Sequence, residues 1–265
     1  MYHNIGKPSD GARHRGLYVS PWRFERHVRF LKACGRRPVS MTEAMPYLTG
    51  ERVGRIAVIT LDDGCLDNFL YAAPILKKHG CTATCYAVSQ HMGSFNQWDA
   101  ARLNVKKPLM SRDQLREWAS MGLEVGAHTQ THARLTQTGD YRLNEEIDGC
   151  KSDLEAVLGT PVTQFSYPHG NWDSRAAHAV RSAGFRAAVT TRRGRSRPGD
   201  ELFCLPRVKV RGCDFPLLFA LKILTRYEDR HQESALKRRA PGRNHGQEMR
   251  SVHHGQGSRR QLQRI

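Results

Sequence analysis

Residues 56–64 read Ile-Ala-Val-Ile-Thr-Leu-Asp-Asp-Gly, an apolar, β-branched run that ends on two carboxylates and a glycine. Such a run is typical of a buried strand, because β-branched side chains pack well on a sheet. Asp62 and Asp63 follow at once, so the strand would deliver both carboxyl groups at its end. Gly64 would permit a sharp exit. The stretch therefore predicts a buried strand that brings two adjacent acids to one point.

Short apolar runs alternate with helical stretches on both sides of this segment. The first helical stretch starts at Ser20-Pro21, a good N-cap followed by proline, and ends by Gly35. Strands that alternate with helices imply a parallel sheet with right-handed crossovers, and their number here favours a barrel over an open sheet. The expected strands cover 55–60, 81–88, 123–127, 164–167, 186–190 and 203–210, and the expected helices 21–35, 68–79, 112–122, 141–158 and 174–183.

The chain has 265 residues, enough for one large α/β domain with a full core. We expect a catalytic domain over 1–225 and a basic, disordered tail over 226–265. Residues 91–110 form a long connection of the kind that is usually functional or disordered. The tail holds ten Lys and Arg against four acids, and residues 181–211 hold nine against two, so these two segments carry most of the net charge of +17.

The hydropathy, the N-terminal residues and the cysteines indicate a cellular compartment. No apolar run approaches the roughly 18–20 residues that cross a bilayer. Residues 1–10 also lack the charged start and apolar stretch of a secretory signal, so the expected location is cytoplasmic. An apolar run would normally precede Tyr2 and His3, which leaves open a truncated N-terminus. The seven Cys predict buried free thiols rather than disulfides or a structural metal site.

Chemically active residues follow several of the predicted strands. Residues at the carboxyl ends of barrel strands point into one mouth, so Asp63, His128 and His132 can meet there. Two neutral imidazoles and a carboxylate suit a divalent cation such as Zn²⁺, with positions left for water and substrate. Asp62 would be free to take a proton from that water as general base. An isolated Asp-Asp-Gly is more often a turn and an isolated His-x-x-x-His a solvated pair, but their joint position at strand ends favours a catalytic metal site.

Three other interpretations stay open. A two-histidine, one-carboxylate set also suits a non-haem iron oxygenase, although those enzymes usually use antiparallel barrels. The basic charge allows a protein that mainly binds nucleic acid or an anionic surface, although no recognition helix or aromatic platform accompanies it. A metal-binding relative with impaired catalysis is the third alternative, and it depends on whether a general acid is present.

Three segments carry a specific resemblance. They are ITLDDGCLDNFLYAAPILKKHGCTATCYAV at 59–88, LEVGAHTQTHARL at 123–135 and FSYPHGNWD at 165–173. Together they resemble the successive motifs of the polysaccharide deacetylase family, the NodB-homology carbohydrate esterases of family 4. The opening MYHNIG resembles the branch of that family with an N-terminal Tyr-His, and the likeness covers roughly residues 1–212.

The resemblance implies a distorted (β/α)7 barrel that removes acyl groups, usually N-acetyl, from amino sugars. It gives Asp62 the role of base and makes Asp63, His128 and His132 the ligands of a divalent metal, with zinc expected. The substrate would be a saccharide, either a polymer, an oligomer or a lipid-linked sugar, and the resemblance does not separate acetyl from formyl.

Further site residues are implied by the same resemblance. The backbone N–H of Tyr167 would help to hold the oxyanion, and Pro168 and Gly170 would shape that loop. Trp98, in the long connection, would either cover the mouth and stack on a sugar ring or anchor the loop by packing.

The chain departs from the family pattern at three places, and the third concerns the general acid. Leu61 replaces a commoner Phe, and Ser166-Tyr167 stands where many members have an arginine. The late Leu-x-His that supplies the acid in many members is absent. We therefore expect His3 to protonate the leaving amine, with His169 as a weaker alternative.

Two features concern partners rather than chemistry. The basic tail would permit weak contact with an anionic membrane or a nucleic acid. Residues 215–224, Phe-Pro-Leu-Leu-Phe-Ala-Leu-Lys-Ile-Leu, are expected to form a helix that either caps the barrel or touches a membrane. The sequence does not indicate an oligomeric state.

Overall fold

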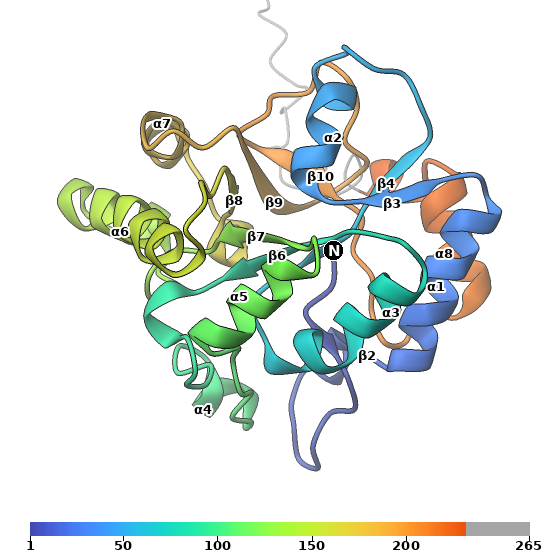
Figure 1. Ribbon diagram of the computed structural model, residues 1–265, viewed down its shortest axis with the longest axis horizontal. Helices are drawn as coiled ribbons and strands as arrows, with labels where there is room; N and C mark the ends of the chain where they lie inside the picture. The colour runs from blue at the N-terminus through green and yellow to red at the C-terminus, as the bar shows by residue number, and fades with distance from the viewer. Residues whose placement is uncertain (232–265) are drawn as a thin grey trace, which may run out of the picture.

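Parallel strands form the centre of the molecule in the computed structural model, which describes residues 1–231 (Figure 1). The strands are β1 (Asn4–Ile5), β2 (Tyr18–Val19), β3 (Arg37–Val39), β4 (Ile56–Val58), β5 (Thr60–Leu61), β6 (Thr84–Ala87), β7 (Glu124–Ala127), β8 (Gln164–Ser166), β9 (Ala187–Arg193) and β10 (Leu205–Arg207). Six of them lie in one sheet in the order β10-β9-β8-β7-β6-β5, and every pairing in it is parallel. Two parallel pairs, β1-β2 and β3-β4, accompany this sheet.

The N-terminal segment closes the ring of strands. On one side the N–H of Tyr2 donates to Thr60 O at 2.8 Å, which joins it to β5. On the other side Met1 donates to Val208 O at 2.9 Å and accepts from Val210 N–H at 3.2 Å. Because the segment with these two partners directly follows β10, the hydrogen bonds connect the last strand of the sheet to the first and complete a distorted barrel.

Helices cover the outside of the barrel (Figure 1). The apolar residues that share one face of the first helix, Phe24, Val28 and Leu31, are all buried. The predicted α/β architecture with a NodB-type (β/α) barrel is therefore confirmed. The helices are α1 (Pro21–Ala33), α2 (Met41–Leu48), α3 (Ala73–Lys78), α4 (Ala100–Leu103), α5 (Arg112–Ser120), α6 (Asp140–Leu158), α7 (Ser174–Ser182) and α8 (Pro216–Leu224), and a π-helical turn at Asn68–Ala72 leads into α3.

The strand expected at 55–60 is divided between two pairings. Its first part, β4, pairs with β3, whereas β5 pairs with β6. Ile59 lies where the partner changes, since its N–H donates to Val39 O at 3.1 Å and its O accepts from Thr84 N–H at 2.9 Å. One apolar run thus serves two strands, which its residue pattern does not reveal.

A serine precedes two of the predicted helices. Ser111 closes a full capping box at the start of α5. Ser20 stands at the N-cap of α1, but its side chain makes no capping hydrogen bond, so the predicted cap is wrong in its contact. Proline at the first helical position still fits, because the amide hydrogen that it lacks would have had no partner within the helix.

Acidic residues after α8 compensate the basic loop after β9. Glu228 is fully buried and accepts from Arg193 Nη2 at 2.9 Å. Asp229 pairs with Arg195 at 3.3 Å and Arg197 at 2.8 Å. Part of the positive charge of 181–211 is therefore neutralised inside the domain. The disordered tail was expected to begin at 226, which is wrong for residues 226–231, because Glu228 and Asp229 pack against the domain. The rest of the predicted tail, 232–265, lies outside the described part of the chain.

The cysteines are free as predicted, although two of the seven are not buried. All seven Cys are free, five of them are buried, Cys34 is half-buried and Cys213 is exposed. Within residues 1–231, no helix combines the length and the apolar character needed to cross a membrane.

Candidate metal centre

A tight turn after β5 separates the two adjacent carboxylates. Asp63 has a φ of 77° and Gly64 one of 72°. A positive φ is costly for a residue other than glycine, so the surroundings must hold Asp63 in this conformation. A Cβ on Gly64 would lie 3.2 Å from the Cα of Ala87, because the turn passes close to β6. The turn sends Asp62 and Asp63 to different partners.

Asp63 meets the two predicted histidines. Its Oδ1 lies 3.7 Å from His128 Nε2 and 3.6 Å from His132 Nε2. The potential ligand atoms of the three residues lie within 4.8 Å of one another, and all three residues are buried. They follow β5 and β7, which are separated in the sheet by β6. The structure thus brings together the three residues expected to bind a metal.

Each imidazole ring has a second contact besides Asp63. His128 Nδ1 lies 2.6 Å from Ser166 O, which makes Nδ1 the protonated nitrogen and leaves a lone pair on Nε2. His132 stacks on Trp98, with ring centroids 4.5 Å apart and ring planes 17° apart. Trp98 therefore packs against a candidate ligand, with one face of its ring already covered.

Positive φ angles are concentrated at this site. Among residues 1–231, six residues other than glycine have positive φ, and four of these six belong to the candidate site or adjoin it in the chain. Backbone strain of this kind persists only where neighbouring contacts over-determine the conformation, and it is commonest at functional sites. The four are Asp63, Thr129, His132 and His169.

A buried lysine that the sequence did not single out holds the other oxygen of Asp63. Lys107 Nζ lies 3.1 Å from Asp63 Oδ2, and only 3% of its side chain is exposed. Burial opposes the charge on both groups, but their attraction outweighs it, so the pKa of Asp63 is well below its usual value and that of Lys107 is raised. Burial lowers the pKa of His132 to about 3, which leaves its imidazole neutral at pH 7. Asp63 therefore faces the histidines as an ionised carboxylate.

An arginine that the sequence also did not single out binds Asp62. Arg207 donates from Nη1 and Nη2 to Oδ1 and Oδ2 of Asp62 at 2.7 Å each, and both residues are buried. Thr190 O, at 2.8 Å, and Thr60 Oγ1, at 3.2 Å, position the guanidinium. Burial opposes ionisation of Asp62, but the guanidinium outweighs it and lowers the pKa of Asp62. Asp62 is therefore an ionised carboxylate held in one orientation.

His3 lies at the same mouth. The pairing of Tyr2 with Leu61 places His3 beside Asp62 in the register of the strands. Burial lowers the pKa of His3, and the charges of Asp63 and Asp62 partly offset this effect. The imidazole is therefore placed where a general acid could reach the site.

The amide of Tyr167 does not face the mouth, contrary to expectation. Its N–H donates to Val189 O at 3.1 Å between β8 and β9, and its hydroxyl donates to Phe203 O at 2.9 Å. The predicted oxyanion contact from this amide is therefore wrong, because strand pairing already uses the N–H. Two residues later, the ring of His169 lies 4.6 Å from that of His132. The His169 amide makes no hydrogen bond to any described residue.

Gly170 is required by the close approach of β9. It has a φ of 73°, and a Cβ would lie 2.1 Å from Thr191 Oγ1 and 2.4 Å from Thr191 N. No other residue fits there without moving the backbone. Together with the buried Pro168, Gly170 fixes the short turn that carries His169.

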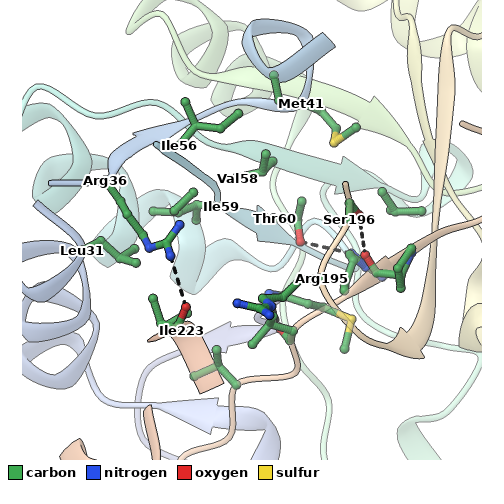
Figure 2. A pocket seen from close by; sticks show the side chains of 18 of the residues that line it. Leu31, Arg36, Met41, Ile56, Val58, Ile59, Thr60, Arg195, Ser196 and Ile223 are labelled. Carbon is green, nitrogen blue, oxygen red and sulfur yellow. Dashed lines mark hydrogen bonds between the residues drawn. The ribbon is translucent and has the colours of Figure 1, made fainter. Parts of the chain in front are cut away.

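A separate cavity of about 230 Å³ lies away from the ligands (Figure 2). Apolar side chains, including Ile56 and Val58, surround the guanidinium groups of Arg36 and Arg195 in this view. Neither aspartate and neither histidine of the candidate metal centre lines it. Thr60 and Arg207 do line it, so the cavity adjoins the residues that hold Asp62 without containing the candidate ligands.

The geometry of the three candidate ligands fits a divalent cation. Atoms bound to zinc at about 2.0–2.1 Å with tetrahedral angles lie roughly 3.4 Å apart. The separations of 3.6 and 3.7 Å are close to this value and too long for hydrogen bonds. His132 Nδ1 is buried without a partner, so no hydrogen bond in the described chain commits this ring to another role. A divalent cation would satisfy all three donors.

Known proteins resemble this chain over most of its described length. The family model for polysaccharide deacetylase matches residues 49–188. The putative polysaccharide deacetylase YxkH of Bacillus subtilis (strain 168) is 27% identical over 212 residues, which cover 79% of this chain and 70% of that protein. A poly-beta-1,6-N-acetyl-D-glucosamine N-deacetylase of Staphylococcus aureus (strain N315) is 22% identical over 206 residues, which cover 72% of this chain and 67% of that protein.

Solved structures share the barrel. The Streptococcus pyogenes deacetylase PplD in complex with acetate has a TM-score of 0.74 and 22% identity, over 84% of this chain and 96% of that one. The putative polysaccharide deacetylase BA0330 from Bacillus anthracis has a TM-score of 0.71 and 26% identity, over 84% of this chain and 67% of that one. At 22% identity, the first likeness concerns the fold alone.

Proposed function

The chain belongs to the polysaccharide deacetylase family, and we propose that it is a metal-dependent hydrolase that removes an N-acetyl group from an amino sugar within a saccharide. The observation that carries the proposal is the position of Asp63 Oδ1 opposite Nε2 of both His128 and His132. A second ionised carboxylate, that of Asp62, is the adjacent residue. This is the set of groups that hydrolysis of an unactivated amide requires.

Asp63, His128 and His132 would hold the cation, for which zinc is the first candidate because of the nitrogen-rich donor set. When bound, a divalent cation polarises the amide carbonyl and lowers the pKa of a coordinated water towards about 7. Lys107 keeps Asp63 Oδ2 occupied at 3.1 Å, so that Oδ1 remains directed at the histidines. The fixed carboxylate gives the site a defined geometry before substrate arrives.

Asp62 would accept the proton of the attacking water. The bidentate contact with Arg207 fixes the direction of its carboxylate and keeps it ionised, which a base must be before the reaction. Arg207 is a positioning residue in this scheme, because it acts on the water only through Asp62.

His3 would deliver a proton to the leaving nitrogen, since an amine is expelled with difficulty unless it is protonated. The carbonyl oxygen gains negative charge as water adds, and an amide N–H aimed at it would stabilise that charge. The N–H of His169 is our candidate for this contact, in place of the Tyr167 amide that strand pairing uses.

A substrate panel tests the proposed function. The Staphylococcus aureus relative is named for poly-beta-1,6-N-acetyl-D-glucosamine, which makes oligomers of that sugar the first compounds to try. We expect acetate and one new free amine to appear in equal amounts, without cleavage of the glycosidic bond. An N-formylated series separates acetyl from formyl preference. Metal-loaded protein that leaves every N-acylated sugar intact would instead favour the impaired metal-binding relative.

Replacing His3 with Gln should lower amide hydrolysis by about 10²–10⁴-fold, the usual contribution of a general acid. The same variant should cleave p-nitrophenyl acetate at close to the wild-type rate, because p-nitrophenolate leaves without protonation. The ratio of the two rates is the measurement, since a merely structural defect would lower both.

His178→Gln is the matched control, because this histidine is exposed on α7 and is not among the residues of the candidate site. It should retain both activities. If His3→Gln leaves the ratio of amide to ester rates unchanged, the acid lies elsewhere, and His169 becomes the next residue to replace.

A further inference from the structure

An apolar stripe lies exposed on α8. Leu217, Leu221 and Leu224 are spaced so that they share one helical face, and they are 64%, 38% and 51% exposed. Phe215, at the N-cap of the same helix, is 55% exposed. Single exposed apolar residues are ordinary, but a contiguous group on one helix marks a surface that contacts something.

The opposite face of α8 is anchored in the domain. Lys222 is 4% exposed, and its ammonium binds Asp214 and donates to Lys209 O at 2.8 Å. Phe219 stacks on His27 of α1, with ring centroids 3.8 Å apart. The helix therefore buries its lysine and presents its leucines outward. These contacts fix that orientation, so the exposed stripe is a property of the fold.

Residues of α1 continue this surface, and α1 lies beside α8 (Figure 1). Trp22 is 55% exposed and lines a groove together with Pro216. The guanidinium of Arg26 lies 5.3 Å from the centre of the Trp22 ring. Arg26 and Arg29 are exposed and form no ion pair with any residue in 1–231. We call the following set the α1–α8 face: Trp22, Arg26, Arg29, Phe215, Leu217, Leu221 and Leu224.

The exposed charges of the α1–α8 face are positive. The acid of α1, Glu25, binds Lys78 at 2.7 Å and His79 at 2.9 Å. Asp214 is buried against Lys222. Apart from this face, the sequence of residues 232–265 carries eight Lys and Arg against two acids. Exposed apolar side chains and uncompensated positive charge therefore occur together.

We propose that the α1–α8 face docks on the surface of an anionic lipid bilayer. A helix of nine residues is far too short to span the roughly 30 Å hydrocarbon core, so α8 would lie in the plane of the interface. Its leucines would enter the acyl region, and Arg26 and Arg29 would meet lipid phosphates. Tryptophan favours this depth, because its ring is apolar and its N–H is polar.

Docking through the sides of α1 and α8 leaves the mouth of the barrel uncovered, with its edge close to the membrane. Trp22 and Phe215 lie at the starts of α1 and α8, which follow β2 and β10 along the chain. In a β/α barrel the helix starts lie at the end where the strands terminate, which is also where Asp62 and Asp63 stand. The proposal concerns where the enzyme works, and its test does not depend on deacetylase activity.

Charge argues against a second copy of the chain as the partner. A two-fold contact would place the same patch on both sides, so each copy would bring its own Arg26 and Arg29 to the contact. Like charges brought together in a desolvated contact repel. An anionic lipid surface complements both the arginines and the leucines.

Vesicle sedimentation of the full chain tests the proposal. We expect the protein to pellet with vesicles of phosphatidylcholine and phosphatidylglycerol, and far less with phosphatidylcholine alone. The combined variant Leu217→Gln, Leu221→Gln and Leu224→Gln should bind the anionic vesicles at least about tenfold more weakly, since three apolar side chains no longer enter the bilayer. Arg26→Gln with Arg29→Gln should weaken binding and reduce its dependence on salt.

Val53→Gln with Tyr141→Gln is the matched control, because both residues are highly exposed hydrophobics outside this face. It should pellet like the wild type, and melting temperatures should show that all variants fold. A leucine variant that binds anionic vesicles as tightly as the wild type overturns the proposal, because the basic segment 232–265 would then suffice. So does wild-type protein that stays in solution with both vesicles. A leucine-dependent dimer without vesicle binding would assign the face to a second copy.

Discussion

Replacing Asp62 with Asn should lower the rate of acetate release by about 10³-fold, equivalent to about 4 kcal/mol at the transition state, while the protein still binds its metal. An amide cannot take a proton from water, so the loss falls on the chemical step. Asp63, His128 and His132 keep their donor atoms, so metal content should stay at one equivalent per chain. Rate and metal content should be measured on the same preparation.

The variant needs a folding control, because Asp62 also neutralises a buried arginine. Arg207 retains Thr190 O and Thr60 Oγ1 as acceptors, which limits the loss of folding stability. The melting temperature of Asp62→Asn measures what remains, and Asp113→Asn, at an exposed position on α5, should behave as the wild type. Turnover by Asp62→Asn above about a tenth of the wild-type rate would mean that another group is the base.

Replacing His132 with Ala should remove both metal and activity. The change deletes one of three donor atoms, and even outer partners of metal ligands typically cost about 10–100-fold in affinity when replaced. We therefore expect metal affinity to fall by more than about a hundredfold, as measured by competition with a chelating dye. Together, the two variants separate the residues needed for metal binding from the residue needed for catalysis by the bound metal.

His91→Ala is the control for His132→Ala. Like His132, His91 packs against Trp98, with ring centroids 5.5 Å apart. It is not among the candidate ligands. It should keep its metal. His132→Cys should recover part of the affinity, since a thiolate is a good zinc ligand. Normal metal binding by His132→Ala would remove this histidine from the site.

The candidate ligands were predictable because the sequence marks their places. Asp63 and His128 each follow an apolar strand directly, and parallel strands in a barrel end at one mouth. Their meeting therefore follows from the fold alone, without knowledge of any side-chain contact. The same reasoning places His3, because its neighbour Tyr2 pairs with the end of β5.

The two cations that fix the carboxylates were not predictable. Arg207 lies 145 residues from Asp62, and Lys107 lies 44 residues from Asp63. The chain contains 42 Lys and Arg, and neither of these two stands in a local pattern that distinguishes it. Only tertiary packing shows which cations are buried against acids. Arg207 in particular lies in β10, where the residue pattern predicts only a strand.

The error at Tyr167 has a related cause. Which amides are free at the end of a strand depends on the register with the neighbouring strand, and here β9 takes the N–H of Tyr167. Sequence pattern alone does not fix that register. The divided strand at 55–60 fails in the same way, since a change of pairing partner leaves no trace in an apolar run.

Stepwise addition of zinc to the metal-free chain, with acetate release from an N-acetylglucosamine oligomer followed throughout, tests the central claim most directly. The site geometry predicts no activity without metal, a linear rise on addition, and a plateau at one equivalent per chain. Activity that is already present in metal-free protein, or that is absent after one equivalent is bound, would contradict hydrolysis at the Asp63–His128–His132 centre.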